Sequence, residues 1–509
     1  MEFDFSFVVL VSFFIFVLVL HKLGVRPKTI KPKRHIPPGP WKLPFIGNLH
    51  LFVGSIPPQH ILRDLAKKYG SMMHLRLGEV DNIIVSSSET AIHFMKTHDK
   101  NFANRPSLLA AEANHNRNIS FAPYGEYWRH MRKICTLELL TAMRVRSFWP
   151  IREEEVLDLC NWIARHEGEN INLTERISLT NYDIMVRASV GKKNDEKAEF
   201  IATVKEIVKF ISVFSIADVY PSIKFLALIS GTKRKLEEVH RKLDKMMTSI
   251  VEERKRTKDN NIYNNDEENK QEDLLDVLLS IQSDGSLELP LTRDNIKYIL
   301  VEIFSAGAMT SEIVVDWAMA EMLNNPETMK KAQEEVRQVF DGKGGGRVDE
   351  SCFNELKYLR LVIKETLRMH PPAPLLLPRE NRERCEIDGY EIPAKTWVLV
   401  NAWAIGRDPE YWEDAERFKP ERFLEKADDF KGNSFNYIPF GAGRRICPGI
   451  LFGLANVEIQ LVMFLYYFDW VLADGVKAEE MDMIDCCGVE GRRKHSLSVI
   501  AVVRRPLPV

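Results

Sequence analysis

The feature that most constrains this chain is a glycine-rich turn around one cysteine, Cys447, in the sequence Phe-Gly-Ala-Gly-Arg-Arg-Ile-Cys-Pro-Gly at residues 440–449. Glycine lets a backbone curl tightly around one sulfur atom and approach a flat ligand closely. Backbone N–H groups in such a turn can hold the sulfur as a thiolate, the form that binds metals. Arg445 adds a planar fork of donors that suits a carboxylate. The pattern therefore predicts a metal ligand at Cys447, against the alternative of a buried structural cysteine.

Four motifs, in order along most of the chain, resemble the signatures of the haem-thiolate cytochrome P450 monooxygenases. The cysteine turn matches FxxGxRxCxG, and the other three are WxxxR at residues 128–132, ExxR at 365–368 and PERF at 420–423. The sequence around these motifs, including residues 37–40 and 435–449, is similar to the plant microsomal branch that oxidises terpenoids and alkaloids. The resemblance implies a mainly α fold with a minor β portion, a single large haem domain, and haem b with the Cys447 thiolate as its axial ligand.

The composition bounds the partners and the cellular compartment. The chain has 509 residues and a net charge of −2, which gives no sign of a nucleic-acid partner. Its seven cysteines are scattered singly, apart from Cys486-Cys487, and this spacing indicates a reducing compartment instead of a disulfide framework. The glycine-rich turn at residues 341–346 lacks the pattern of a phosphate-binding loop, so no nucleotide site is expected there.

The N-terminal segment predicts a retained membrane anchor. Only two serines interrupt an apolar run from Phe5 to Leu20, and extending the run to Leu23 reaches the lower limit of ~17 residues for a spanning helix. Acidic residues precede this run and basic residues follow it, which places the rest of the chain in the cytosol and is the reverse of a cleaved signal. We expect a single-pass anchor in the lipid of the endoplasmic reticulum membrane at residues 1–23, a basic and proline-rich hinge at 24–40, and the catalytic domain at 41–509.

Patterning along the rest of the chain favours one α-rich domain. Residues 81–86 and 396–400 are rich in β-branched and aromatic side chains and predict strands. In most of the other long segments, the apolar residues have the spacing of a helix. None of the segments between the predicted elements has the composition of a domain linker. Residues 254–273 are polar, charged and rich in asparagine, and we interpret them as a solvated surface loop.

The ExxR and PERF motifs predict a structural network. Glu365 and Arg368 lie three residues apart, so they share one face of a helix, where an exposed pair contributes only about 0.2–0.5 kcal/mol. The resemblance adds Arg422 as a third, buried partner. In a buried network, the loss of one partner leaves an uncompensated charge. We therefore expect these residues to support haem incorporation and not to break bonds.

The resemblance also implies the residues that hold the haem. Trp128 and Arg132 fall four apart on a predicted helix and can face one ligand, and the indole N–H of Trp128 can donate one hydrogen bond. Any of the candidate arginines could equally be a solvated surface residue. The predicted cofactor-binding set is Arg105, Trp128, Arg132, Arg379, Phe440, Arg445 and Gly449.

Residues 303–311 are similar to the oxygen-binding helix of the family, with the pattern A/G-G-x-D/E-T. Ala306 and Gly307 are small, and the glycine costs about 1 kcal/mol of helix stability, which is reasonable where a ligand needs room. Thr310 can donate and accept a hydrogen bond beside bound oxygen, although a mid-helix threonine more often bonds back to a preceding carbonyl. These residues, together with Met309, form the predicted catalytic set.

Met309 departs from the family pattern because it replaces the acidic residue before Thr310. A thioether carries no proton at physiological pH. Three explanations stay open: water and Thr310 suffice, hydroxyl or carboxyl groups of the substrate help to supply the proton, or Glu312 serves instead. Glu312 lies three residues further on, and so on nearly the same helix face.

Substrate contacts are expected by region, at residues 107–120, 304–309, 373–377 and 486–489. The three leucines at 375–377 suit an apolar ligand. The polar side chains of Glu112 and residues 114–117 indicate either an oxygenated or basic substrate or an exposed loop. Cys486 and Cys487 lack zinc-site spacing and are interpreted as packing residues.

The implied function is insertion of one oxygen atom from O2 into a hydrophobic plant metabolite. No flavin or nicotinamide motif occurs, so the electrons are expected from a separate NADPH-cytochrome P450 reductase, docked near Lys133 and Arg444. The alternatives are a reductase-independent haem-thiolate isomerase or lyase, oxidative coupling or desaturation of the same substrate class, and a non-catalytic haem-binding partner. Dependence on NADPH separates the monooxygenase from the isomerase.

Overall fold

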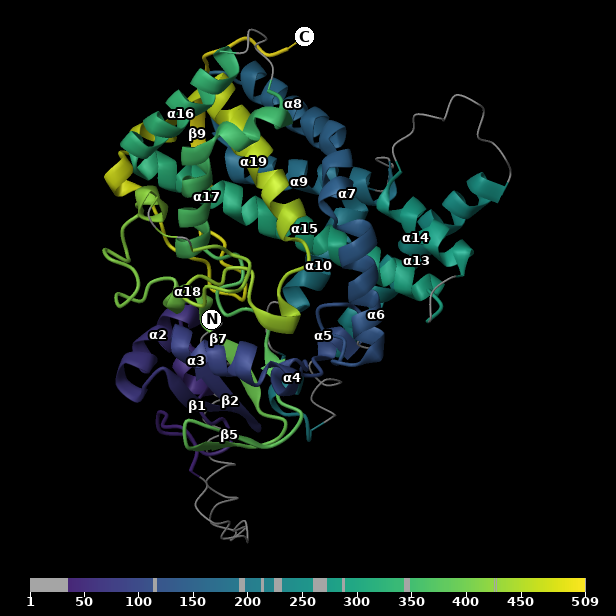
Figure 1. The fold of residues 1–509 in the computed structure, drawn as a ribbon, viewed down its shortest axis with the longest axis vertical. Helices are drawn as coiled ribbons and strands as arrows, with labels where there is room; N and C mark the ends of the chain where they lie inside the picture. The colour runs from purple at the N-terminus through teal and green to yellow at the C-terminus, as the bar shows by residue number, and fades with distance from the viewer. Residues whose placement is uncertain are drawn as a thin grey trace, which may run out of the picture.

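The computed structural model describes residues 35–508 apart from 113–116, 192–196, 212–214, 224–230, 260–271, 286–288, 343–347, 425 and 427. The predicted anchor at 1–23 and most of the predicted hinge lie outside this range. The described chain is mainly helical with three small sheets (Figure 1), which confirms the predicted fold class.

The central element is the long helix α15, Arg293–Asn324. Thr292 caps its N-terminus by accepting a hydrogen bond from the backbone N–H of Asn295, whose side chain bonds back to Thr292 in turn. Helix α15 packs against α9 (Leu173–Val190), α17 (Lys357–Met369) and α19 (Ile450–Tyr467). Helices α15 and α19 are long and apolar enough to cross a membrane, but 50% and 67% of their most apolar windows are buried within the protein. We therefore interpret both as core helices.

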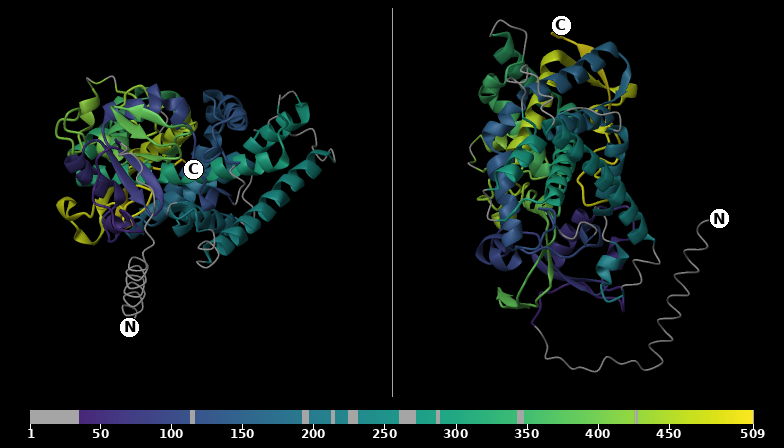
Figure 2. Two further views of the ribbon diagram at one scale, coloured as in Figure 1. Left: turned by 90° about the horizontal axis from the view of Figure 1, so that it is seen from below. Right: turned by 90° about the vertical axis from the view of Figure 1, so that its right-hand side faces the viewer.

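The other helices surround this centre, with α13 and α14 at one side of the molecule, away from the largest sheet (Figures 1 and 2). The longer ones are α2 (Pro58–Tyr69), α6 (Glu126–Ile134), α8 (Trp149–Arg165), α10 (Lys197–Ile211), α13 (Thr232–Asp259), α14 (Leu274–Asp284) and α16 (Pro326–Asp341). The shorter ones are α3 (Ser88–Ile92), α4 (Asp99–Phe102), α5 (Leu109–Glu112), α7 (Ala142–Ser147), α11 (Ile216–Val219) and α18 (Ala402–Ile405). Short 3₁₀ turns include η6 (Pro420–Phe423) and η7 (Gly443–Arg445).

The predicted surface loop at 254–273 is wrong at its beginning. Residues 254–259 form the last turns of α13, and Arg254 is held by ion pairs of 2.7 Å with both Asp273 and Asp276. The basic run continues a helix whose charged side chains meet carboxylates far along the chain, which composition does not reveal. Residues 260–271 of that prediction lie outside the described part of the chain.

Both predicted strands are confirmed, in the largest sheet. Its order is β1 (Met72–Leu77), β2 (Val80–Val85), β7 (Trp397–Val400), β4 (Arg379–Glu380), and β2 runs parallel to β7 with Ile83 opposite Val398. The second sheet has the order β3 (Asn170–Asn172), β9 (Ser498–Val503), β8 (Phe468–Leu472), and β5 (Cys385–Ile387) pairs with β6 (Tyr390–Ile392). Strand β4 matters for the site, because it carries Arg379.

The hydrophobic core has two main parts, which share α15. Residues 313–323 of α15 pack with α8, α16, α17 and α19, whereas residues 296–308 pack with α6, α9, α10, α13 and α14. The core opens near the junction of these two stretches, where Ser305, Ala306, Gly307, Met309 and Thr310 line a cavity. The predicted oxygen-binding segment therefore has one face packed in the core and another face toward the cavity.

Candidate functional site

The cysteine turn lies just before α19 and is shaped by its glycines. The backbone N–H of Cys447 donates to the carbonyl of Phe440 at 3.0 Å, and that of Gly449 donates to the Cys447 sulfur at 3.3 Å. Gly443 has φ +68°, and a Cβ there would lie 2.2 Å from the Met95 carbonyl oxygen, so no other residue fits. Burial raises the pKa of the Cys447 thiol, whereas the Gly449 N–H and Arg132 act in the opposite direction.

A cavity of about 760 Å³ lies between this turn and α15. Its wall is built from α15, α13, the loop before α6, the turn before β4, and the cysteine turn. Every residue predicted to be catalytic, cofactor-binding or metal-ligating lines it: Arg105, Trp128, Arg132, Ala306, Gly307, Met309, Thr310, Arg379, Phe440, Arg445, Cys447 and Gly449. The structure thus brings together side chains that are separated by more than 300 positions along the chain.

Four arginines on one side of the cavity, Arg105, Arg132, Arg379 and Arg445, form what we term the arginine cluster. They donate mainly to backbone carbonyls: Arg105 to Ser120, Leu377 and Pro378, Arg132 to Ile446, Arg379 to Ala442, and Arg445 to Ala103, Ile119 and Ala122. Of the four, Arg379 alone has a carboxylate within ion-pair distance in the described part of the chain, Asp99 at 3.0 Å. Neutral carbonyls hold the guanidinium groups in place without cancelling their charge.

The electrostatics of the arginine cluster reflect this unmatched charge. Burial, followed by the repulsion of Arg379 and Arg132, lowers the pKa of Arg445 to about 9. Burial and the charges of Arg445 and Arg379 likewise lower the pKa of Arg105. Such shifts mark cations that are desolvated and crowded by like charge. A ligand with carboxylate groups would relieve both effects.

Trp128 supports the arginine cluster from α6. Its ring lies 4.2 Å from the guanidinium of Arg445 and 5.5 Å from that of Arg132, within cation–π distance of both. Its indole N–H, the only donor of the side chain, is donated to the carbonyl of Ile119 at 2.9 Å. Trp128 therefore stacks beside the cations and holds the loop before α6.

On α15, the hydroxyl of Thr310 donates to the carbonyl of Ala306 at 2.8 Å, which is the back-bonding typical of a mid-helix threonine. Gly307 packs against a neighbour that the sequence did not indicate. A Cβ at this position would lie 2.7 Å from the methyl group of Met185 on α9, so the glycine admits that side chain. Met185 also lines the cavity, and the space above Gly307 is therefore bounded by α9.

Met309 lines the cavity with its thioether, whereas Glu312 does not line it. Glu312 is 3% exposed, and one of its oxygens accepts a hydrogen bond from Arg492, which also pairs with Glu490 at 2.5 Å. Glu490, and not Glu312, is the member of this group at the cavity wall. Proton delivery by Glu312, one of the three explanations for Met309, would thus require that other groups carry the proton from Glu312 to the cavity.

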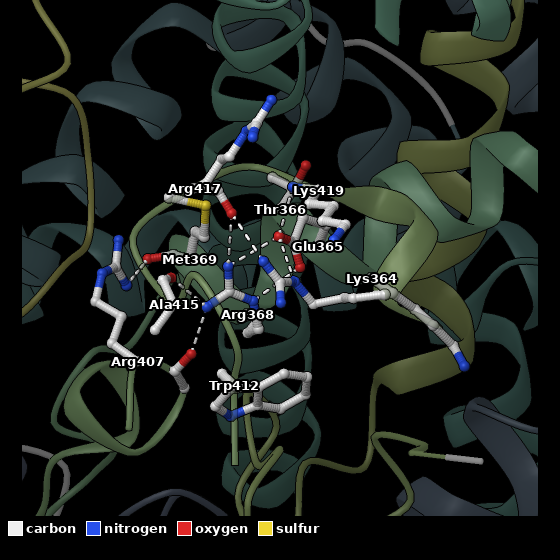
Figure 3. A network of polar contacts seen from close by, with 12 residues as sticks. Lys364, Glu365, Thr366, Arg368, Met369, Arg407, Trp412, Ala415, Arg417 and Lys419 are labelled. Atoms are coloured by element: carbon white, nitrogen blue, oxygen red, sulfur yellow. Dashed lines mark hydrogen bonds and ion pairs between the residues drawn. The ribbon is translucent and has the colours of Figure 1, made fainter. Parts of the chain in front are cut away.

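Glu365, Arg368 and Arg422 form a second group of buried side chains, and none of them lines the cavity. Figure 3 shows Glu365 and Arg368 in this group. Both Glu365 oxygens accept from Arg368 at 2.8 Å, and one also accepts from Arg422 at 2.9 Å. The other N–H groups of Arg368 and Arg422 donate to the backbone carbonyls of Gly406, Glu413, Asp414, Ala415 and Arg417. We call this group the Glu365 network; it ties α17 to the segment before and within η6.

The predicted substrate regions are placed unevenly. Leu376 and Leu377 line the cavity, but Leu375 packs into a separate cluster with Leu62 and Met73. Of the predicted substrate region at residues 486–489, only Val489 lines the cavity. Cys486 is half-buried and Cys487 is exposed, so their interpretation as packing residues is wrong for Cys487. Asn114, His115 and Asn116 lie outside the described residues.

Sequence reasoning missed two carboxylates at the site. Asp99 is buried and accepts from Arg379 and from the backbone N–H and guanidinium of Arg444. Glu302 lines the cavity, four and eight residues before Ala306 and Thr310, so helical spacing could have revealed it. No sequence signal marks Asp99, because its partners lie about 280 and 345 residues away.

Comparison with known proteins places these features in a family. The family model described as Cytochrome P450 matches residues 37–488 of this chain. Among solved structures, a zebra fish cytochrome P450 with abiraterone has a TM-score of 0.73 and covers 88% of this chain and 99% of its own. Its sequence identity is 23%, so that likeness shows the fold alone.

Plant proteins of known activity are much more similar. Salviol synthase of Salvia pomifera is 50% identical over 99% of this chain and 98% of its own length. Premnaspirodiene oxygenase of Hyoscyamus muticus is 48% identical over 98% of this chain and 99% of its own length. Tabersonine 6,7-epoxidase isoform 1 of Catharanthus roseus is 49% identical over 96% of this chain and 97% of its own length. These relatives match the chain along nearly its whole length.

Proposed function

Since this chain belongs to the cytochrome P450 family and is a cytochrome P450 monooxygenase, we propose that it inserts one oxygen atom of O2 into a hydrophobic plant metabolite of the terpenoid or alkaloid class. The names of relatives near 50% identity, a synthase, an oxygenase and an epoxidase, support this substrate class. The electrons come from an NADPH-cytochrome P450 reductase. The single observation that carries the proposal is the cavity that unites Cys447, the arginine cluster and Thr310.

The family implies a haem-thiolate iron, and the donor set of the cavity fits haem b. Cys447 would ligate the iron, and a thiol that coordinates a metal ion loses its proton despite its raised pKa. The arginine cluster, with three cations that have no carboxylate partner among the described residues, would bind the two propionates. Trp128, Phe440 and Gly449 would border the ring. When bound, the haem supplies O2 activation and O–O bond cleavage.

The residues of α15 would position the substrate and the protons. Because the Thr310 hydroxyl donates to Ala306, its oxygen lone pairs are left to accept a hydrogen bond from a water or substrate hydroxyl in the cavity. Ala306 and Gly307 would give the reacting groups room. Met309 cannot carry a proton, so water or a polar group of the substrate would deliver it. The apolar wall at Leu376 and Leu377 would exclude water from the substrate.

The remaining parts of the chain would serve location and stability. Residues 1–23 would anchor the protein to the endoplasmic reticulum membrane by a single pass, with a hinge at 24–40 and the domain at 41–509 in the cytosol. Exposed Lys133 and partly exposed Arg444 would contribute to reductase docking. The Glu365 network would hold the chain that surrounds the haem and take no part in bond breaking.

The proposal is tested with microsomes that contain the chain and a plant reductase, supplied with a terpenoid and alkaloid extract with and without NADPH. We expect products that gain one oxygen atom only when NADPH is present. The Cys447→Ser variant should give none, whereas Cys487→Ser, a matched change at an exposed cysteine, should give the wild-type products. Products formed without NADPH would establish the isomerase instead, and loss of two hydrogens would indicate desaturation or oxidative coupling.

A further inference from the structure

Glu302 places a carboxylate on the face of α15 that borders the reaction space. It lies four residues before Ala306 and eight before Thr310, and all three line the cavity. At a rise of 1.5 Å per residue, these spacings correspond to about 6 Å and 12 Å along the helix axis. A ligand of moderate size can therefore contact Glu302 with one end while its other end lies beside Thr310.

The backbone holds this carboxylate in a fixed position. One oxygen accepts the N–H of Ile119 at 2.5 Å, and the other accepts the N–H of Ser120 at 2.6 Å. The carbonyls of the same two residues accept from the arginine cluster and Trp128, so the loop is bound on both sides. A charged group that is held in this way is preorganised and needs no rearrangement to receive a ligand.

Glu302 differs from every other carboxylate that the described part of the chain contributes to the cavity wall, because each of those is paired with a cation. Glu237 pairs with Lys233 at 3.8 Å, Asp244 and Asp294 pair with Lys297 at 2.5 Å and 3.0 Å, and Glu490 pairs with Arg492 at 2.5 Å. Within the same described residues, Glu302 accepts hydrogen bonds from the backbone N–H groups of Ile119 and Ser120 and from the Ser120 hydroxyl. No lysine, arginine or histidine of these residues lies at ion-pair distance, although the charge of Arg445 acts on the carboxylate from further away. A carboxylate has about four acceptor positions, and three are used, so about one is left for a ligand.

We propose that Glu302 binds the protonated amine of the substrate, and that the chain therefore prefers basic, alkaloid-type ligands over neutral ligands of the same shape. This inference rests on the proposed function and narrows its substrate class. A hydrogen bond between an ammonium group and a carboxylate in an apolar cavity is about twice as strong as one between neutral groups.

The test uses the holoenzyme in lipid nanodiscs and two probes of one shape. N,N-dimethyldecylamine is a cation at neutral pH, whereas N,N-dimethyldecanamide is neutral. Their dissociation constants are measured by the Soret absorbance shift and by equilibrium dialysis, with empty nanodiscs to subtract partitioning into lipid. The variant Glu302→Gln removes the charge, and its single amide oxygen can accept only one of the two backbone N–H groups, so the affinity for the neutral amide probe reports whether the loop keeps its position. Glu237→Gln makes the same change at a paired carboxylate of the same wall.

We expect wild type and Glu237→Gln to bind the amine at least tenfold more tightly than the amide, and Glu302→Gln to lose that preference while its amide affinity stays within twofold. Equal weakening of both probes would show that Glu302 only holds the loop, and an unchanged amine affinity would show that it binds no cation; either result overturns the proposal. Failure of the proposed function looks different, since products that gain one oxygen atom in the presence of NADPH would then be absent. Dialysis of the same protein would still decide the role of Glu302.

Discussion

Two groups of buried arginines in this molecule differ in how their charge is balanced. In the Glu365 network, Arg368 is 1% exposed and Glu365 is fully buried, and each guanidinium is bonded to Glu365 and to carbonyls (Figure 3). In the arginine cluster, Arg379 alone of the four has a carboxylate partner among the described residues, Asp99. The first group is complete within the chain, whereas the second carries charge that the described chain does not match.

The difference separates structural from ligand-binding charge. A buried ion pair that is satisfied within the chain makes stability depend on every partner, because removal of one leaves the others unpaired. A cluster of like charges opposes folding and persists where a ligand supplies the missing anions. Mutations should therefore act on protein stability in the Glu365 network and on ligand affinity in the arginine cluster.

The largest effect is expected from Glu365→Gln. The change leaves Arg368 and Arg422 without their carboxylate in a buried place and should destabilise the protein by about 3–5 kcal/mol. Urea unfolding and the yield of haem-bound protein measure this effect. Glu413→Gln, at an exposed side chain of the same segment, is the control. A variant with wild-type stability would remove the distinction between the two groups.

The variant Arg132→Gln, in the arginine cluster, should change protein stability less than Glu365→Gln does. Its main effect should be on the affinity for haem. The glutamine is shorter and loses the one hydrogen bond to the carbonyl of Ile446, so the unfolding free energy of the apoprotein should fall by only about 1 kcal/mol. Haem affinity should fall about tenfold with the loss of one charge-assisted hydrogen bond. Arg129→Gln, on the exposed side of α6, should change neither. Loss of apoprotein stability equal to that of Glu365→Gln would contradict the comparison.

Met309→Asp sharpens the comparison by adding a carboxylate on the ligand side of the cavity. If the substrate helps to supply the proton, the fraction of NADPH electrons that ends in product should change by roughly twofold or more, because an acid then competes for that task. The measurement compares NADPH consumed with product formed, with Met309→Leu as the control of equal size. An unchanged ratio would exclude substrate-assisted proton delivery.

The smallest effect concerns Glu302 and pH. Burial raises the pKa of this carboxyl above its ordinary value of 4.5, whereas hydrogen bonds from Ser120 and Ile119 and the charge of Arg445 oppose the shift. The folded protein therefore binds this proton more tightly than the unfolded chain, and stability should decline as pH rises above about 4.5. Chemical unfolding between pH 4 and pH 7 should show a shallower decline for Glu302→Gln than for wild type. Parallel curves would contradict the raised pKa.

Local patterns predicted the parts of the site that are set by neighbouring residues. The cysteine turn, the pairing of Glu365 with Arg368 and the helical face from Ala306 to Thr310 each depend on spacing within a few positions, and so do strands β2 and β7. The relation of these parts to one another came from the family resemblance and not from periodicity.

Contacts between distant segments could not be predicted in this way. Met185 explains the size of Gly307 from another helix, and Glu302 contacts backbone groups 182 and 183 residues away. Arg254 lies in α13 and pairs with Asp273 and Asp276, although the composition of residues 254–273 is that of a loop. In each case the partner that gives the residue its role is absent from the local sequence.

The central claim is that the arginine cluster exists to bind the carboxylates of a haem. The most direct test is titration of the apoprotein with haem and with haem dimethyl ester, in which both propionates are blocked. The account predicts that wild type binds haem at least tenfold more tightly than the ester, and that Arg132→Gln reduces this preference. Equal affinity of wild type for haem and its ester would contradict the account, because the unmatched charge would then have no carboxylates to bind.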